Sequence, residues 1–247
     1  MSLEGKVAIV TGGGKGIGKA ISICLAKGGV DIVAAARTAE DVKQTASEIE
    51  ALGKRALGLS IDITSEVQIG EMVKKTMDIF GRIDILVNNA GIISNGMVEN
   101  MSLKDWQTAI DTNLTGPFLC CREVLGIMKR QGCGKIITIS SMSGRRGLPN
   151  TSAYCASKYG LTGLMDSLAK EVGKDNITVT TIFPGLVDTG MAANVDFKHR
   201  KSELRSPDNW CKPEDIAEAV LMAANMPHRT SIMDISVVPT RQRGVDI

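Results

Sequence analysis

Short apolar runs alternate with longer amphipathic stretches along the chain. The short runs are rich in β-branched residues, whereas apolar positions recur every three to four residues in the longer stretches. The first pattern predicts buried strands and the second predicts helices that cover a sheet. We expect strands over residues 6–11, 31–36, 56–60, 84–88, 134–140, 177–183 and 232–238. We expect helices over residues 16–27, 39–52, 66–80, 103–129, 152–172 and 213–225.

This alternation of strands and helices predicts an α/β fold. Right-handed crossovers would produce a doubly wound, seven-stranded parallel sheet with helices on both faces. A length of 247 residues, 43% of them hydrophobic, suits a single domain over residues 1–247. Residues 187–211 form a polar stretch after the sixth strand, where ligands approach such a sheet. They are expected to form a substrate lid or, alternatively, a solvated charged loop.

Charge and composition exclude several kinds of partner. A formal charge of +2, from 29 basic and 27 acidic residues, gives no electrostatic reason to expect nucleic acid or an anionic membrane. No apolar run reaches the ~20 residues of a membrane span, and MSLEGKVAIVTGG leads directly into a strand, so we expect a cytoplasmic protein. With two histidines, His199 and His228, and no CxxC spacing, we expect no metal site.

Glycines cluster where the first strand gives way to the first helix, in the run Gly12-Gly13-Gly14-Lys15-Gly16-Ile17-Gly18. Glycine permits a tight turn and a close approach of the backbone to a pyrophosphate, while the amides at the helix start favour its negative charge. A tight structural turn would use glycine as well. Because strand, turn and helix follow in the required order, we favour dinucleotide binding.

The end of the second strand indicates which dinucleotide is bound. An acidic residue commonly binds the adenosine ribose of NAD at this point, but here Ala36 is followed by Arg37. Arg37 and Lys15 would attract a 2′-phosphate through charge-assisted hydrogen bonds. We therefore expect NADP(H) to be preferred over NAD(H), with a solvated Arg37 as the alternative.

Tyr154 and Lys158 lie four residues apart, which places both side chains on one face of a helix. A phenol with a pKa near ~10 exchanges protons poorly at neutral pH unless a nearby ammonium stabilises its phenolate. Tyr154 would then act as the general acid/base for a carbonyl/alcohol pair. Ser141 follows the fifth strand and would hold the carbonyl oxygen.

With these motifs the sequence closely resembles the classical short-chain dehydrogenase/reductase family over nearly its whole length. Thr11-Gly12 with Gly16 and Gly18 looks like the TGxxxGxG cofactor turn. Asp62-Ile63 is similar to the acidic segment that contacts adenine, and Asn88-Asn89-Ala90-Gly91 to the NNAG segment beside the cofactor. The resemblance implies a Rossmann fold and hydride transfer between nicotinamide C4 and a small carbonyl or secondary alcohol substrate.

The same resemblance assigns further roles. It makes Asn113 the fourth catalytic residue, which holds a water that connects Lys158 to solvent. It selects Ser141 over its neighbouring serines, since the catalytic serine of the family usually lies thirteen residues before the tyrosine. The segment FPGLVDTGM matches the region that meets the nicotinamide carboxamide and the pyrophosphate, through Pro184, Gly185, Val187 and Thr189.

The tail SIMDISVVPTRQRGVDI departs from the TGQTLxVDGG tail of acyl-carrier-protein reductases. It looks more like the branch with 3-hydroxy-acid and serine-type dehydrogenases. The substrate is expected to be of the 3-oxoacyl or 3-hydroxy acid type or another small ketone. A non-catalytic NADP-binding sensor or scaffold is the alternative, and the intact set of four catalytic residues argues against it. The sugar-nucleotide epimerases share Tyr and Lys but are longer and use a TGxxGxxG turn.

Several other residues leave alternatives open. Arg145 and Arg146, just after Ser141, would attract an anionic substrate or lie in a solvated loop. Met142, Leu148, Met191 and Met222 would add apolar surface to a pocket or an interface. The helices expected at 103–129 and 152–172 carry more apolar residues than one sheet-facing stripe needs. Family resemblance implies that they form the interface of a homodimer or homotetramer.

Overall fold

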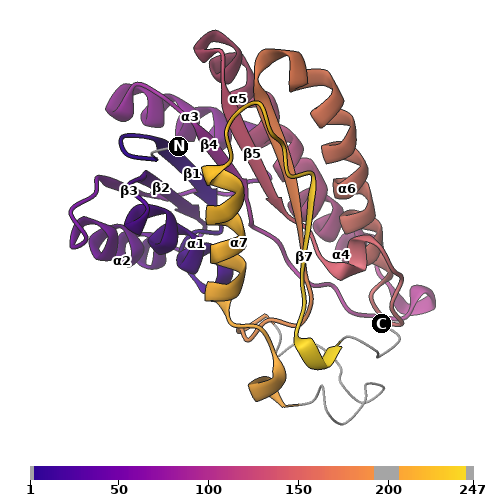
Figure 1. The fold of residues 1–247 in the computed structure, drawn as a ribbon. Helices are drawn as coiled ribbons and strands as arrows, with labels where there is room; N and C mark the ends of the chain where they lie inside the picture. Colours follow the sequence, from indigo (N-terminus) through magenta and orange to yellow (C-terminus); the bar gives the residue numbers. More distant parts are fainter. Residues whose placement is uncertain (1–2, 192–205, 243–247) are drawn as a thin grey trace.

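The computed structural model describes residues 3–191 and 206–242 and contains one parallel sheet of seven strands. Its strand order is β3-β2-β1-β4-β5-β6-β7, so the chain starts near the middle, winds to one edge and then continues to the other (Figure 1). The strands are β1 (Val7–Thr11), β2 (Asp31–Ala36), β3 (Ala56–Ser60), β4 (Ile85–Asn88), β5 (Gly134–Ile139), β6 (Ile177–Pro184) and β7 (Asp234–Val237).

Helices cover both faces of this sheet, as Figure 1 shows. The sheet is buried on both sides because successive residues of a strand point to opposite faces. In β1, Ala8 and Val10 join the core beneath α1, α2 and α7, whereas Ile9 joins the core beneath α3, α5 and α6. The predicted doubly wound fold is thus confirmed. These helices are α1 (Gly16–Lys27), α2 (Ala39–Glu50), α7 (Pro213–Asn225), α3 (Glu66–Phe80), α5 (Gly116–Gln131) and α6 (Ser152–Val172).

The predicted helix over 103–129 is not uniform. It begins as α4 (Leu103–Ile110), widens into a π-helical turn at Asp111–Thr115 and continues as α5. A π turn holds one more residue than an α turn, and such turns frequently occur at functional sites. The last strand is also shorter than predicted, since β7 spans Asp234–Val237 at the edge of the sheet.

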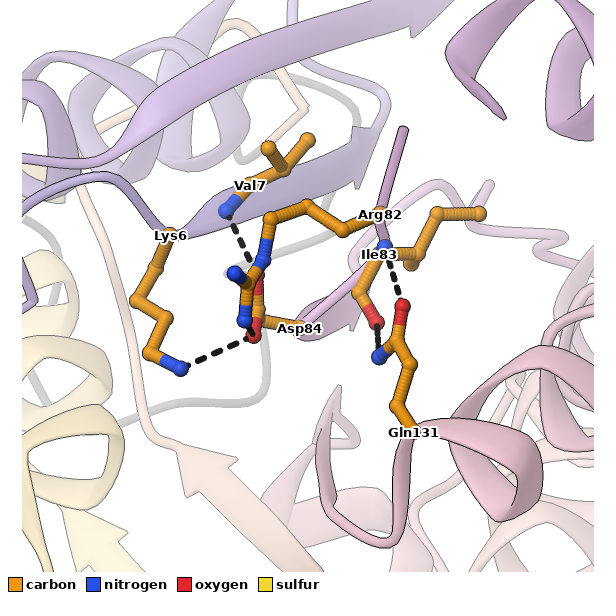
Figure 2. Close-up of polar contacts among 6 residues, drawn as sticks. All are labelled: Lys6, Val7, Arg82, Ile83, Asp84 and Gln131. Carbon is orange, nitrogen blue, oxygen red and sulfur yellow. Dashed lines mark hydrogen bonds and ion pairs between the residues drawn. The ribbon is translucent and has the colours of Figure 1, made fainter. Parts of the chain in front are cut away.

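A buried carboxylate fixes the amino ends of β1 and β4. Asp84 accepts hydrogen bonds from the Val7 amide (3.0 Å), from Lys6 (3.1 Å) and from Nε and Nη2 of Arg82, both at 2.6 Å (Figure 2). Burial alone would raise the pKa of Asp84, but these hydrogen bonds outweigh it and hold the pKa below its ordinary value. Beside it, Gln131 pairs with the backbone of the residue that precedes Asp84. The two central strands are thereby joined at the edge away from the glycine turn.

At the opposite, carboxyl edge, β1 and β4 form the point where the winding direction reverses. The segments that follow these two strands diverge to opposite faces, and the crevice between them is where open α/β sheets bind ligands. Within the described residues, no helix has the length and hydropathy needed to cross a membrane.

Candidate active site

A cavity of about 440 Å³ lies at the carboxyl edge of the sheet. Its walls come from the segments after β1, β4, β5 and β6 and from the first turns of α6. The structure therefore gathers most of the predicted site residues from distant parts of the chain. Those that line the cavity are Gly12, Lys15, Gly16, Ile17, Gly18, Asn89, Ala90, Gly91, Ser141, Tyr154, Lys158, Pro184, Gly185, Val187 and Thr189.

The glycine turn leaves no room for side chains at its key positions. A Cβ on Gly18 would lie 2.1 Å from the Gly12 carbonyl oxygen, and a Cβ on Gly12, whose φ is +66°, would lie 2.7 Å from Asn89 Nδ2. A Cβ on Gly14 would lie 2.7 Å from the Cβ of Asp41. The turn thus brings bare backbone and the amino end of α1 to the cavity, which suits the pyrophosphate of a dinucleotide.

Thr11 connects the turns after β1 and β4. Its hydroxyl accepts hydrogen bonds from the amides of Asn89 (3.0 Å) and Ala90 (3.1 Å) and donates to the carbonyl of Val87 (3.3 Å). Asn89 Nδ2 donates in return to the Thr11 carbonyl at 2.9 Å. Sequence reasoning matched Thr11 to the turn motif but gave it no role. The signal available in the sequence was a hydroxyl-bearing residue at the end of a strand, where it can face the neighbouring strand of the sheet.

Lys158 is buried on α6, one turn from Tyr154. Its Nζ donates a hydrogen bond to the Ile139 carbonyl at 2.9 Å and lies 5.9 Å from the centre of the Tyr154 ring. Burial lowers the pKa of Lys158 from 10.5 to about 8 because the charged form loses its hydration. The ammonium form still predominates at pH 7, so a positive charge lies close to the phenol.

Tyr154 lines the cavity and is partly buried. Burial raises its pKa above the ordinary value of 10.0, and a hydrogen bond with Ser141 opposes that shift. The phenol is therefore protonated at neutral pH, the form that can donate a proton. Ser141 lies two residues beyond the end of β5, and its Oγ accepts a hydrogen bond from the Ser143 amide at 3.1 Å.

Asn113 lies in the π-helical turn, fully buried behind the cavity rather than in its wall. Its Oδ1 accepts from the Ile92 amide at 2.8 Å, and its Nδ2 donates to the Ile92 carbonyl at 2.9 Å. Nδ2 also donates to the hydroxyl of Ser157 at 3.0 Å, and Ser157 in turn donates to the Tyr154 carbonyl at 2.7 Å. Ser157, which sequence reasoning did not single out, thus connects Asn113 to the helix of Tyr154 and Lys158.

The residues assigned to the adenosine end lie outside the cavity wall, except for Lys15. Arg37 is exposed after β2, and Lys15 forms an ion pair with Asp41 at 3.0 Å. A backbone hydrogen bond from Thr64 chiefly lowers the pKa of Asp62, and the nearby positive charge of Arg37 contributes. The side chain of Ile63 is buried in the core, so only its backbone remains for a ligand.

Apolar side chains also line the cavity that Ser141 and Tyr154 share. They are Ile93, Met142, Leu148, Leu186 and Met191. Ile93 and Leu186 carried no signal in the sequence, because a single apolar residue does not show which way it will point.

The two ends of the stretch predicted as a lid, residues 187–211, lie next to each other in the structure. Val187 and Cys211 form a parallel bridge, and Lys212 Nζ donates to Asp188 at 2.7 Å. Residues 192–205, which make up most of this stretch, lie outside the described residues. The assignment of 187–211 as a lid therefore remains a prediction.

Comparison with known proteins shows which family this chain resembles. The short chain dehydrogenase family matches residues 6–200. A 3-oxoacyl-[acyl-carrier-protein] reductase of Synechocystis sp. is 36% identical over 229 residues, which cover 92% of this chain and 92% of that protein.

Two solved structures share the fold over nearly the whole chain. A 7α-hydroxysteroid dehydrogenase complexed with NADH and 7-oxo glycochenodeoxycholic acid has a TM-score of 0.88 and 31% identity and covers 96% of this chain and 94% of that one. A metagenomic short-chain oxidoreductase in complex with NADP has a TM-score of 0.83 and 32% identity, with coverages of 97% and 99%. Sequence and fold thus lead to the same conclusion, that this chain belongs to the short-chain dehydrogenase family of oxidoreductases.

Proposed function

We propose that the protein is an NADP(H)-dependent oxidoreductase that interconverts a carbonyl and a secondary alcohol. The observation that carries the proposal is the meeting of Ser141, Tyr154 and Lys158 in one cavity whose other end is the glycine turn. The glycines and the amino end of α1 suit the cofactor's pyrophosphate, and the cavity lining with Ser141, Tyr154 and Lys158 suits its nicotinamide end. We further propose that residues 1–247 act as one catalytic domain with 187–211 as its lid.

When bound, the cofactor supplies or accepts the hydride at C4. Ser141 would donate a hydrogen bond to the substrate oxygen, and Tyr154 would protonate that oxygen during reduction or remove the alcohol proton during oxidation. The buried ammonium of Lys158 lowers the cost of the phenolate that forms when Tyr154 gives up its proton. Asn113 joins the π-helical turn before α5 to the backbone of Ile92 and to Ser157 of α6, the helix that carries Tyr154 and Lys158.

Two cations support a preference for NADP(H). Arg37 replaces the carboxylate that would repel a 2′-phosphate, and Lys15 lines the cavity beside the glycine turn. Lys15 pairs with Asp41, so phosphate binding would exchange one anionic partner for another. We expect Arg37→Ala to reduce the NADPH-over-NADH ratio of kcat/KM by roughly 10- to 100-fold, the loss of one charge-assisted contact.

The apolar residues of the cavity wall support the proposal that the substrate is a carbonyl compound with an apolar substituent. Met142, Leu148 and Met191 line the same cavity as Ser141 and Tyr154. Burial of such a substituent would favour binding by about 25 cal/mol per Å² of apolar surface. A 3-oxoacyl or 3-hydroxy acid type compound with an alkyl chain, or another small apolar ketone, meets this requirement. The relative from Synechocystis, a 3-oxoacyl-[acyl-carrier-protein] reductase by name, supports the inclusion of 3-oxoacyl thioesters.

The test is the decay of nicotinamide absorbance with NADPH and separately with NADH over 3-oxoacyl thioesters, 3-oxo acids, diketones, ketoses and aromatic aldehydes. We expect turnover that favours NADPH and is lost in Tyr154→Phe. The chain has 2 tyrosines, and Tyr159 is exposed on the same helix, so Tyr159→Phe is the matched control. Tight NADPH binding without turnover on any substrate would support the sensor or scaffold instead, and equal use of NADH would refute the role of Arg37.

We also expect a homodimer or homotetramer in the cytoplasm. Phe118 of α5 and Tyr159 of α6 are exposed, with 42% and 46% of their surfaces accessible, on the helices that the family resemblance assigns to the interface. Light scattering of the purified protein would determine the number of subunits, and fractionation of the source cells would test the location.

A further inference from the structure

The turn that follows Ser141 is held by its own backbone. The amide of Gly144 donates to the Ser141 carbonyl at 2.8 Å, and the amide of Arg145 donates to the Met142 carbonyl at 3.0 Å. Since Ser143 also donates to the Ser141 hydroxyl, the position of this turn determines where the Ser141 side chain points.

On one side the turn lies tightly against α6, the helix of Tyr154 and Lys158. A Cβ on Gly144 would lie 2.7 Å from Ser140 Oγ and 3.0 Å from the Lys158 carbonyl oxygen. The backbone of the turn can therefore approach the catalytic helix only because a glycine stands there. A small displacement of the turn would therefore move Ser141 relative to Tyr154 in the cavity that both line.

On the other side Arg145 fastens the turn to the edge of the sheet. Its guanidinium carbon lies 3.6 Å from the centre of the Phe183 ring, and Phe183 is fully buried. Nη1 donates to Ser236 Oγ at 3.2 Å, and Nη2 forms an ion pair with Asp234. Phe183 of β6 and Ser236 of β7 are partners in the sheet, so one side chain spans two strands.

Stacking contributes more to this arrangement than the ion pair does. The side chains of Arg145 and Asp234 remain 36% and 47% exposed, and exposed ion pairs are weak. The planar guanidinium over a buried ring, by contrast, has one preferred orientation, which lysine cannot reproduce.

Both ends of this contact are places where the sequence is distinctive. Arg145 follows Ser141 closely, and Asp234 and Ser236 belong to the tail that departs from the TGQTLxVDGG pattern. Although 89 residues separate Arg145 from Asp234, the structure joins them. Arg145 does not line the cavity, which leaves it poorly placed to bind an anionic substrate.

We propose that Arg145 is a positioning residue for Ser141. By stacking on Phe183 and pairing with the edge strand, it holds the Met142–Gly144 turn so that Ser141 faces the cavity that Tyr154 also lines. This inference rests on the proposed function for its effect on turnover, but its effect on Tyr154 does not depend on any substrate.

The first test is steady-state kinetics of Arg145→Met and Arg145→Lys, with Arg146→Met as a matched control that loses the same charge one residue later. We expect Arg145→Met to lower kcat by roughly 10- to 100-fold, the cost of a misplaced catalytic group, with little change in the affinity for NADPH. Arg145→Lys should recover only a small part of that loss. A kcat within twofold of wild type in Arg145→Met, or a raised substrate KM with full kcat, would overturn the proposal.

The second test is ultraviolet titration of Tyr154, which needs neither substrate nor cofactor. Measured in a Tyr159→Phe background, where Tyr154 is the remaining tyrosine, Arg145→Met should raise the pKa of Tyr154 further because the opposing Ser141 hydrogen bond weakens. Arg146→Met should leave it unchanged. An unchanged pKa in Arg145→Met, with native circular dichroism, refutes the positioning role. Absence of wild-type turnover together with the expected pKa change would refute the proposed function alone.

Discussion

Replacement of Lys158 by methionine is expected to make the protein's stability less dependent on pH. Lys158 is 4% exposed, and its pKa falls from 10.5 in the unfolded chain to about 8 in the folded one. At ~1.4 kcal/mol for each pKa unit, burial of the charged lysine lowers the free energy of unfolding by about 3 kcal/mol at pH values below 8. Methionine removes that cost together with the charge that the proposed chemistry uses.

The sign follows from proton binding. Between pH 8 and 10.5 the unfolded chain keeps the Lys158 proton while the folded chain releases it, so the wild-type free energy of unfolding rises with pH. The variant lacks this rise. Methionine also leaves the Ile139 carbonyl without its 2.9 Å hydrogen bond, but that loss is the same at every pH and cancels from the comparison.

The assay is urea unfolding at a series of pH values from about 7 to 10.5, at one protein concentration, followed by tryptophan fluorescence. Both chains should carry Tyr154→Phe, because the raised pKa of Tyr154 would otherwise lower stability in the same alkaline range. We expect the wild-type Lys158 chain to gain about 3 kcal/mol relative to the methionine variant across this range. Parallel profiles would show that Lys158 titrates normally in the folded chain and would refute the reasoning.

Three other perturbations have equally definite outcomes. Gly18→Ala should abolish NADPH binding in calorimetry, because the new Cβ would lie 2.1 Å from a backbone oxygen of the turn, whereas Gly163→Ala, with nothing within 4 Å, should bind normally. Ser157→Ala removes one of the two acceptors of Asn113 Nδ2, so unfolding free energy should fall by about 1 kcal/mol and kcat should fall as well; unchanged values would show that this contact is unimportant. Asp84→Asn should cost about 3 kcal/mol in urea unfolding because it removes the buried negative charge that accepts hydrogen bonds from Lys6 and Arg82. Since the folded pKa of Asp84 is lowered, its contribution is lost as pH falls through that value, and the variant should show a weaker acid transition.

Sequence reasoning was most successful where the physics is local. Every predicted strand and helix has a counterpart in the structure. Strands buried on both faces are continuous apolar runs, whereas helices buried on one face carry apolar residues every three to four positions, so the sequence distinguishes them. The Tyr154–Lys158 spacing gave a shared helical face for the same reason. The helix predicted over 103–129 hid a π turn at Asp111–Thr115, since the hydrogen bonds of Asn113 to Ile92 reach across the fold and leave no mark on the apolar pattern.

The sequence by itself determined the order of elements, the parallel sheet, the glycine turn and the residue types available for acid–base chemistry, because each depends on spacing or on the backbone freedom of single residues. Tertiary structure alone decided which of these residues meet. It buried Lys158 and so lowered its pKa to about 8, and it placed Ser157 against Asn113. It also joined Arg145 to Asp234 across 89 residues of chain. Desolvation and long-range contacts arise only when the packed sheet brings distant segments together, and for this reason no local pattern encodes them.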